Sequence, residues 1–128
     1  MDILLDTQVI LWSISGDSRL SRQAGSVFLD PTNNLYFSIA GYWEIAIKIS
    51  IGKLVLADRW SVIIDREMRG NFIKFLPITQ KHCNSLTELP FYHRDPFDRM
   101  IVAQAKTEQM ALLSADPQLK KYEIEVIW

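Results

Sequence analysis

The sequence has 128 residues, of which 48% are hydrophobic and 23% are charged, and its formal net charge is −1. This length fits one domain over residues 1–128, and the composition excludes disordered and collagen-like chains. No apolar run approaches the roughly 20 residues that a membrane span requires, and no signal-like segment precedes residue 3, so we expect a cytoplasmic protein with no membrane association. The small net charge gives no general attraction for nucleic acid, so RNA binding would require a local basic rim.

Short apolar runs alternate with amphipathic segments along the chain, and Gly, Pro, Ser, Asn or Asp residues separate most of them. In chain order the predicted elements are a strand at 3–5, a helix around 9–12, a helix at 21–30, a strand at 35–37, an ambiguous segment at 40–51, a helix at 58–69, a strand at 72–76, a helix at 79–86, a loop at 89–92, a helix at 95–109, a strand at 111–113 and a strand at 123–128. Strands that alternate with helices are typical of a mostly parallel sheet covered on both faces. We therefore predict an α/β fold, a three-layer α/β/α sandwich with a five-stranded sheet.

Residues 40–51 fit two structures. β-Branched residues recur at every second position over 45–51, which favours a half-buried strand. With helical spacing, the same residues leave one polar stripe, on which Glu44 and Lys48 form an i, i+4 pair before Gly52 ends the helix. Periodicity alone does not distinguish these alternatives.

The most informative stretch is residues 93–105, which reads His-Arg-Asp-Pro-Phe-Asp-Arg-Met-Ile-Val-Ala-Gln-Ala. Asp95 is a favourable N-cap, Pro96 suits the first helical position, and Asp98 falls at N3, as in a capping box. The helix then becomes almost wholly apolar, which is typical of a helix buried against a sheet. Helix capping by itself explains both acids.

In open α/β sheets, ligands bind beyond the carboxyl ends of the strands. Asp6 directly follows the first strand, Asp116 follows the fourth, and Asp98 begins the helix that precedes the fourth. Each acid also has an ordinary structural interpretation, as a helix cap, a turn former or, for Glu44, the partner of Lys48. The topology nevertheless predicts that three acids face one crevice.

Several carboxylates in one crevice repel one another, and no basic residue neighbours Asp6 or Asp116 in the sequence. A divalent cation would remove this repulsion, and Mg²⁺ and Mn²⁺ prefer oxygen ligands, whereas one cysteine and two histidines are too few for a Cys/His zinc site. The chemistry that follows is metal-assisted hydrolysis of a phosphodiester. Thr7 and Ser114 lie beside these acids and are candidates to bind a water or a phosphate oxygen, or simply to cap.

Four basic residues are candidates to line a groove for an RNA backbone, although scattered basic residues usually form a solvated face. They are Lys48, Lys53, Arg94 and Arg99. His82 and His93 have no carboxylate or serine pattern around them, and we predict structural roles for both.

Several motifs together resemble PIN-domain proteins, and in particular the VapC-like ribonuclease toxins of type II toxin–antitoxin systems. The motifs are residues 5–7 (Leu-Asp-Thr), 43–48 (Trp-Glu-Ile-Ala-Ile-Lys), 93–105, 114–117 (Ser-Ala-Asp-Pro) and 126–128 (Val-Ile-Trp). They extend over nearly the whole chain, and the block at 93–105 is the most specific. The resemblance implies a compact α/β/α sandwich and assigns residues 40–51 to a helix.

The resemblance also implies a function. Members of this family are RNA-cutting enzymes that depend on Mg²⁺ or Mn²⁺, are silenced by a cognate antitoxin protein and commonly form homodimers. By resemblance, the catalytic and metal-binding acids are Asp6, Glu44, Asp98 and Asp116, and Asp95 remains the helix cap. The residues that this comparison places around the acids, or against the substrate, are Thr7, Asp95, Arg99 and Ser114.

Three residues depart from the pattern of this branch. Gln8 stands where histidine is frequent, Gly41 where a small hydroxyl residue is usual, and Ser114 where threonine is usual. Because none of these changes removes a carboxylate, they bear on substrate contacts more than on metal binding.

The main alternative is a catalytically inactive PIN-like module that binds RNA or a protein partner, for which the apolar residues of 42–60 offer either a surface or part of the core. A phosphomonoesterase with a similar sheet would need a second aspartate two residues after Asp6, where Gln8 stands. A dinucleotide-binding fold would need a Gly-x-Gly-x-x-Gly motif after the first strand, and the sequence has none there.

Overall fold

The computed structural model describes residues 1–57 and 59–128, so the predicted helix start at Asp58 lies outside the described residues. The elements alternate between strands and helices, as the sequence predicts. They are β1 (Asp2–Leu5), α1 (Thr7–Ser15), α2 (Arg22–Leu29), β2 (Asn34–Ser38), α3 (Ile39–Ser50), α4 (Trp60–Gly70), β3 (Lys74–Leu76), α5 (Gln80–Thr87), α6 (Pro96–Glu108), β4 (Ala111–Leu113), a short 3₁₀ helix η1 (Pro117–Lys121) and β5 (Val126–Ile127).

The five strands form one sheet in the order β3-β2-β1-β4-β5, and every neighbouring pair is parallel. Leu5 at the end of β1 is in register with Phe37 of β2 and Leu113 of β4. Since the three strands end at the same level, the residues that follow them emerge side by side at one edge of the sheet. This register determines where Asp6, which follows β1, lies relative to the residues that follow β4.

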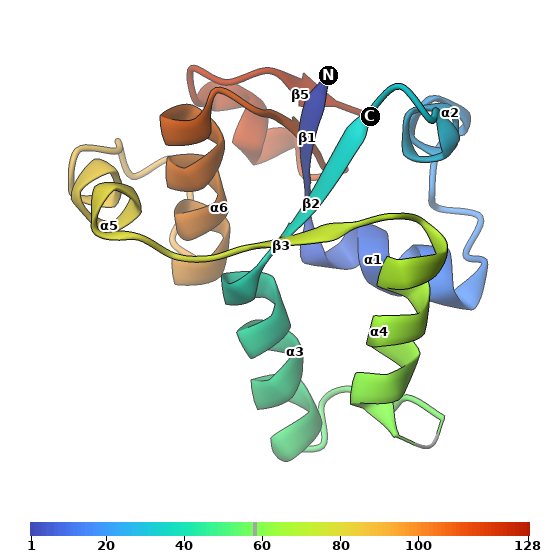
Figure 1. Ribbon diagram of the computed structural model, residues 1–128. Helices are drawn as coiled ribbons and strands as arrows, with labels where there is room; N and C mark the ends of the chain where they lie inside the picture. The colour runs from blue at the N-terminus through green and yellow to red at the C-terminus, as the bar shows by residue number, and fades with distance from the viewer. Residues whose placement is uncertain (58) are drawn as a thin grey trace.

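Helices cover both faces of the sheet, which confirms the predicted three-layer sandwich (Figure 1). On one face, side chains of α1, α2, α3 and α4 pack with Ile3, Leu5 and Phe37 in one core cluster. On the other face, α6 packs with Leu4 and Leu112 in a second cluster. After the exposed Asp2, the residues Ile3, Leu4 and Leu5 of β1 point alternately to opposite faces and are all buried, which explains why these three positions are apolar.

Residues 40–50 lie in helix α3 and Ile51 is its C-cap, so the strand interpretation of their alternating pattern is wrong. Ser38 is the N-cap of this helix, and its hydroxyl accepts a hydrogen bond from the amide of Ala40 at 3.0 Å. The buried residues of α3 are Ala40, Gly41 and Ile45, of which Gly41 and Ile45 are one helical turn apart. The predicted Glu44–Lys48 pair forms, with 3.2 Å between the carboxylate and the ammonium group.

Two predicted strands are shorter in the structure. The strand predicted at 72–76 begins only at Lys74, because Phe72 has a left-handed backbone conformation (φ 56°) at the end of α4. The strand predicted at 123–128 is limited to Val126–Ile127.

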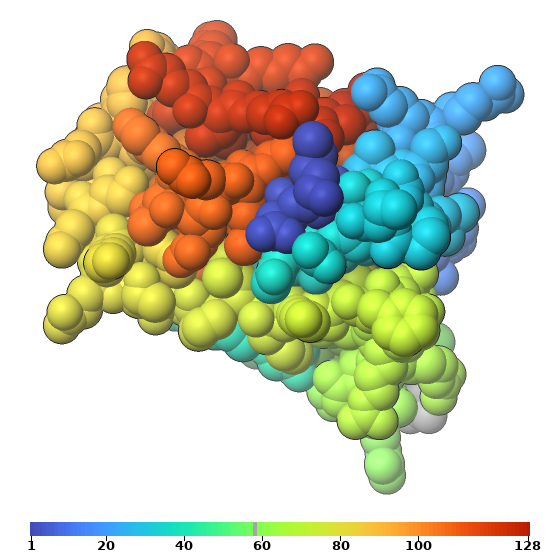
Figure 2. Space-filling model, turned by 45° about the horizontal axis from the view of Figure 1, so that its top comes forward, coloured from blue at the N-terminus to red at the C-terminus, as the bar shows by residue number. Residues whose placement is uncertain are grey.

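At the amino edge of the sheet, the first residues of the chain lie between the segment around residue 34 and the segments next to β4 (Figure 2). The amide of Asn34 donates to the carbonyl of Met1 at 2.8 Å, which continues the β1–β2 ladder to the terminus. Over residues 1–57 and 59–128, the structure contains no helix with the length and apolarity needed to span a bilayer.

Candidate active site

A cleft of about 380 Å³ lies where β1 and β4 end and α6 begins. Its lining residues are Asp6, Thr7, Gln8, Trp12, Glu44, Lys48, Asp95, Asp98, Ala115, Asp116 and Pro117. All four predicted acids are among them, so the structure brings the quartet together. A larger hollow of about 470 Å³ lies beside Leu29 and Phe72, and the only acid among its lining residues is Asp30. The acids therefore favour the smaller cleft as the site of chemistry.

Asp6 occupies the N-cap position of α1, but within the described chain its side chain caps no backbone amide. Its carboxylate instead accepts a hydrogen bond of 2.6 Å from the Ser114 hydroxyl, which reaches across from the end of β4. Burial, reinforced by the charge of Glu44, raises the pKa of Asp6, and the hydrogen bond from Ser114 opposes this shift. The Asp6 carboxylate therefore lies at the cleft, where Ser114 holds it.

Ser114 also connects Asp6 to Asp116. The backbone amide of Asp116 donates to the Ser114 hydroxyl oxygen at 3.1 Å, while the hydroxyl donates to Asp6. Asp116 in turn caps η1, since one of its carboxylate oxygens accepts from the amide of Gln118 at 2.9 Å. The fully buried Ser114 thus holds the acids that follow two neighbouring strands.

The start of α6 separates the roles of its two acids. Asp95 is the helix cap, as predicted, because its carboxylate accepts from the amides of Phe97 at 2.8 Å and Asp98 at 3.3 Å. The side chain of Asp98 is 22% exposed and faces the cleft. Burial, followed by the charges of Asp6 and Asp95, raises the pKa of Asp98 to about 7. Burial and the neighbouring charges therefore disfavour the ionised form of Asp98.

His93 belongs to the site, and the prediction of a purely structural role is wrong. Its Nε2 lies 2.9 Å from a carboxylate oxygen of Asp116 and 3.1 Å from one of Asp98. The sequence contains a usable signal, because a histidine two residues before an N-cap aspartate is close enough to accept the hydrogen bond of the cap amide. His82, by contrast, is fully buried and fulfils the predicted structural role in the capping of α5.

Arg99 does not contact the cleft, which corrects its prediction as an outer or substrate contact. It is 4% exposed, its guanidinium donates to the carbonyl oxygens of Pro90 and Leu86 at 2.9 and 3.2 Å, and it stacks on the ring of Phe91. A buried guanidinium needs such acceptors, and these carbonyls belong to the last turn of α5 and to the loop that connects it to α6. Arg99 therefore holds this loop in place.

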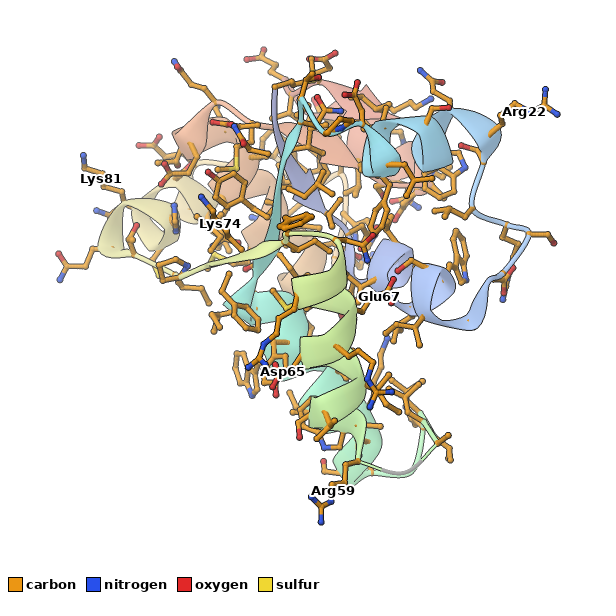
Figure 3. The ribbon with its side chains drawn as sticks, turned by 45° about the vertical axis from the view of Figure 1, so that its right-hand side comes forward. Arg22, Arg59, Asp65, Glu67, Lys74 and Lys81 are labelled. Atoms are coloured by element: carbon orange, nitrogen blue, oxygen red, sulfur yellow. The ribbon has the colours of Figure 1, made fainter. Side chains whose placement is uncertain are left out.

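The other predicted basic residues divide between the cleft and the surface. Lys48 lines the cleft and pairs with Glu44, whereas the exposed Lys53 and Arg94 are not among the lining residues. Arg22, Arg59 and Lys81 point away from the domain in different directions (Figure 3). The predicted basic rim is thus limited to Lys48 at the cleft itself.

Thr7 and Gly41 form a close contact beneath the cleft. A Cβ atom at residue 41 would lie 2.7 Å from the Thr7 hydroxyl oxygen and 2.6 Å from a ring carbon of Phe37. These distances are too short for any side chain, so the glycine found in place of a small hydroxyl residue is a steric requirement of this packing. Thr7 is buried and is one of the residues that line the cleft.

The donor set fits a divalent cation that prefers oxygen. Four carboxylates from α3, α6 and the ends of β1 and β4 converge, and burial, reinforced by the charges of neighbouring acids, raises the pKa values of Asp6 and Asp98. The His93 ring nitrogen and the carboxylates of Asp98 and Asp116 lie within 4.8 Å of one another, so the two carboxylates are close enough to share one ion. Mg²⁺ and Mn²⁺ are the ions that this oxygen-rich arrangement suits.

Comparison with solved structures finds similar folds along nearly the whole chain. VapBC2 from Rickettsia felis, bound to a DNA fragment from its promoter, has a TM-score of 0.71 at 13% identity and covers 99% of this chain and 98% of that chain. DNA-bound VapBC from Salmonella typhimurium has a TM-score of 0.71 at 13% identity, with 99% and 97% covered. VapBC-5 from Mycobacterium tuberculosis, a member of the VapBC family of toxin–antitoxin systems, has a TM-score of 0.63 at 13% identity, with 98% and 97% covered.

At these identities the structural likeness establishes the fold alone, and no match was found among curated proteins. The sequence profile of the PIN domain, however, matches residues 3–125. This match includes the residues that line the cleft, up to Pro117, and with them Asp6, Glu44, Asp98 and Asp116. The chain therefore belongs to the PIN-domain family.

Proposed function

We propose that this protein is a divalent-metal-dependent endoribonuclease and the toxin component of a type II toxin–antitoxin system, acting in the cytoplasm. The observation that carries the proposal is the convergence of Asp6, Glu44, Asp98 and Asp116 in one cleft at the carboxyl edge of the sheet. The raised pKa of Asp98 supports this proposal, because burial and the nearby negative charges disfavour its ionised form, and a bound cation would offset both effects. Membership of the PIN-domain family supports a nuclease in particular.

In this proposal the four acids hold Mg²⁺ or Mn²⁺, and neighbouring groups orient three of them. Asp6 and Asp116 are oriented by Ser114 and by the Gln118 amide, and Asp98 is carried by the first turn of α6. When bound, the ion polarises the phosphodiester and promotes formation of the attacking hydroxide. Asp95 contributes indirectly, since it caps the helix that presents Asp98.

Two groups at the cleft are suited to the RNA itself. Lys48 lines the cleft and is 42% exposed, so its ammonium group can contact a phosphate while remaining near Glu44. Thr7 offers a hydroxyl at the cleft wall as a donor to a phosphate oxygen.

The proposed partners are a cognate antitoxin and a second copy of the chain. The solved structures with similar folds include VapBC toxin–antitoxin complexes, which supports an antitoxin as a partner of this chain. Within residues 42–60, Tyr42 and Trp60 pack on each other with 5.0 Å between ring centroids, whereas Trp43, Ile51 and Val55 are more than half exposed. The exposed members provide apolar surface for such partners.

The decisive experiment is RNA cleavage by the purified protein with Mg²⁺ or Mn²⁺ and with a chelator, over several structured and single-stranded RNAs. We expect cleavage only with the ion, and Asp6→Asn or Asp98→Asn should retain the fold while reducing the rate about a thousandfold, as the loss of several kcal/mol of metal assistance implies. Glu108→Gln is the matched control, because Glu108 lies at the other end of α6 and contacts His82. Its rate should equal that of the unaltered protein.

Two outcomes would contradict the proposal in different ways. If the aspartate variants unfold, the carboxylates act as caps and supports of the fold. If the unaltered protein and Asp98→Asn are both folded and equally inactive, and neither binds Mn²⁺ in calorimetry, the non-catalytic PIN-like module becomes the better description.

A further inference from the structure

The N-terminus of α6 departs from an ordinary capping box at one hydrogen bond. In a capping box the N3 side chain accepts a hydrogen bond from the backbone N–H of the N-cap residue. Here the N-cap is Asp95 and the N3 residue is Asp98, but the Asp95 amide donates to Nδ1 of His93 at 3.0 Å. His93 thus accepts the bond that would otherwise hold the Asp98 carboxylate against its own helix.

The same hydrogen bond determines which ring nitrogen of His93 carries a proton. Because Nδ1 accepts from the Asp95 amide, its lone pair is engaged and the proton resides on Nε2. Nε2 then donates toward Asp116 at 2.9 Å and Asp98 at 3.1 Å. In this tautomer Nε2 has no lone pair for a metal ion, so His93 acts on the carboxylates rather than as a ligand.

His93 is itself held from two sides. Its backbone amide donates to the hydroxyl of Tyr122 at 3.1 Å. The loop that precedes it is fixed by the buried guanidinium of Arg99, which donates to the carbonyl oxygens of Pro90 and Leu86. A ring with these supports has little freedom to leave the two carboxylates.

From these contacts we infer that His93 is a positioning residue of the metal site: it releases Asp98 from the helix cap and holds Asp98 and Asp116 side by side, so that their remaining oxygens face one ion. The inference rests on the proposed function, since it concerns the same acids. Hydrogen-bond donors behind metal-binding carboxylates orient them, and their loss typically lowers metal affinity by about 10–100-fold.

The test compares two amide replacements in the full-length chain. The side-chain nitrogen of His93→Gln can reach the position of Nε2, whereas His93→Asn can replace only the acceptor at Nδ1 and is too short to reach the carboxylates. We expect His93→Gln to bind Mn²⁺ within a few-fold of the unaltered protein in calorimetry, and His93→Asn to bind about 10–100-fold more weakly. His82→Gln, which alters the other histidine that accepts a hydrogen bond from an N-cap amide, should leave the affinity unchanged.

Each alternative result has a separate meaning. Equal Mn²⁺ affinity of His93→Gln and His93→Asn, with Asp98→Asn strongly impaired, would overturn the role of His93 and leave the proposed metal site intact. Absence of Mn²⁺ binding by the unaltered protein would overturn the metal site itself and with it this inference. Thermal unfolding followed by circular dichroism ensures that only folded variants are compared.

Discussion

Two regions of the molecule, one around His82 and one around His93, hold a histidine ring in nearly the same way. In each ring Nδ1 accepts a hydrogen bond of 3.0 Å from the backbone amide of a helix N-cap residue, Thr79 for His82 and Asp95 for His93. In each ring Nε2 faces a carboxylate oxygen at 2.9 Å. Both rings therefore satisfy a helix terminus with one nitrogen and an acid with the other.

The difference lies in the acids and in the burial of the ring. His82 is fully buried between α5 and α6, and its partner Glu108 is the last residue of α6. His93 keeps 17% of its side chain exposed and faces both Asp98 and Asp116 in the cleft. The same arrangement supports folding where it meets one acid, and assembles a site where several acids converge.

The largest change in stability should distinguish His82→Ala from His93→Ala. His82 is 0% exposed, so its truncation leaves a cavity and an unpaired Thr79 amide, and we expect a loss of about 2–4 kcal/mol in the free energy of unfolding. His93 lies at the rim of the cleft, where water can replace its hydrogen bonds, and its truncation should cost about 1 kcal/mol. Urea denaturation of both metal-free variants measures the two values.

Similar losses in the two variants would contradict the distinction between a histidine needed for folding and one needed for the site. The measurement is made without metal, because a bound ion adds its own stabilisation to the native state. A second reading in the presence of Mn²⁺ then separates metal affinity from intrinsic stability in the same samples.

The sequence predicts those parts of the molecule that depend on short-range patterns. The cap at Asp95, the start of the helix at Pro96 and the buried strand at residues 3–5 are all confirmed, because caps and apolar runs are local features. The convergence of the acids was also predictable, since parallel strands bring their carboxyl ends to the same edge of the sheet.

Contacts between residues that are far apart in the sequence are not predictable from local patterns. His93 meets Asp116 across 23 positions, and Arg99 binds carbonyl oxygens 9 to 13 positions away. Neither partner is visible as a periodic spacing, so the sequence predicts a structural role for His93 and a substrate contact for Arg99. For residues 40–51 periodicity fits two structures. The segment forms a helix that packs Ile45 into the core cluster beside the sheet, and this tertiary contact is not visible in the local sequence.

A second, smaller effect concerns the region around His93, where Asp98 should make the stability of the metal-free protein depend on pH. The pKa of Asp98 is raised to about 7 in the folded state from an ordinary value of 3.8, so the folded chain binds this proton more tightly than the unfolded chain. The stability that protonated Asp98 confers is therefore complete below pH 3.8 and is lost as the pH rises to about 7.

Thermal unfolding in a chelator between pH 5 and pH 8 tests this sign. The melting temperature of the unaltered protein should fall relative to that of Asp98→Asn as the pH rises, by several degrees at pH 8. Asp65→Asn removes a carboxylate from the exposed part of α4 and controls for the change in net charge. Parallel profiles for the unaltered protein and Asp98→Asn would show that the carboxylates in the cleft do not destabilise the metal-free fold.

The smallest expected effect concerns the packing beneath the cleft, which has no counterpart near His82 because α5 and α6 contain no glycine. Gly41→Ala places a methyl group 2.6 Å from the ring of the fully buried Phe37, which cannot move aside, so we expect a net loss of about 1–2 kcal/mol after the gain in helix propensity. Gly25→Ala, in the middle of α2, meets no described atom within 4 Å and should gain up to about 1 kcal/mol. Both substitutions add the same methyl group to a helix, so the second controls for helix propensity. Changes of opposite sign in the free energy of unfolding, measured by urea denaturation, would identify the close approach of α3 to Thr7 and Phe37 as the constraint. Because Glu44 is on the same helix, this contact would then also determine its position at the cleft. A gain in both variants would mean that α3 can shift, and the position of Glu44 would then not depend on this contact.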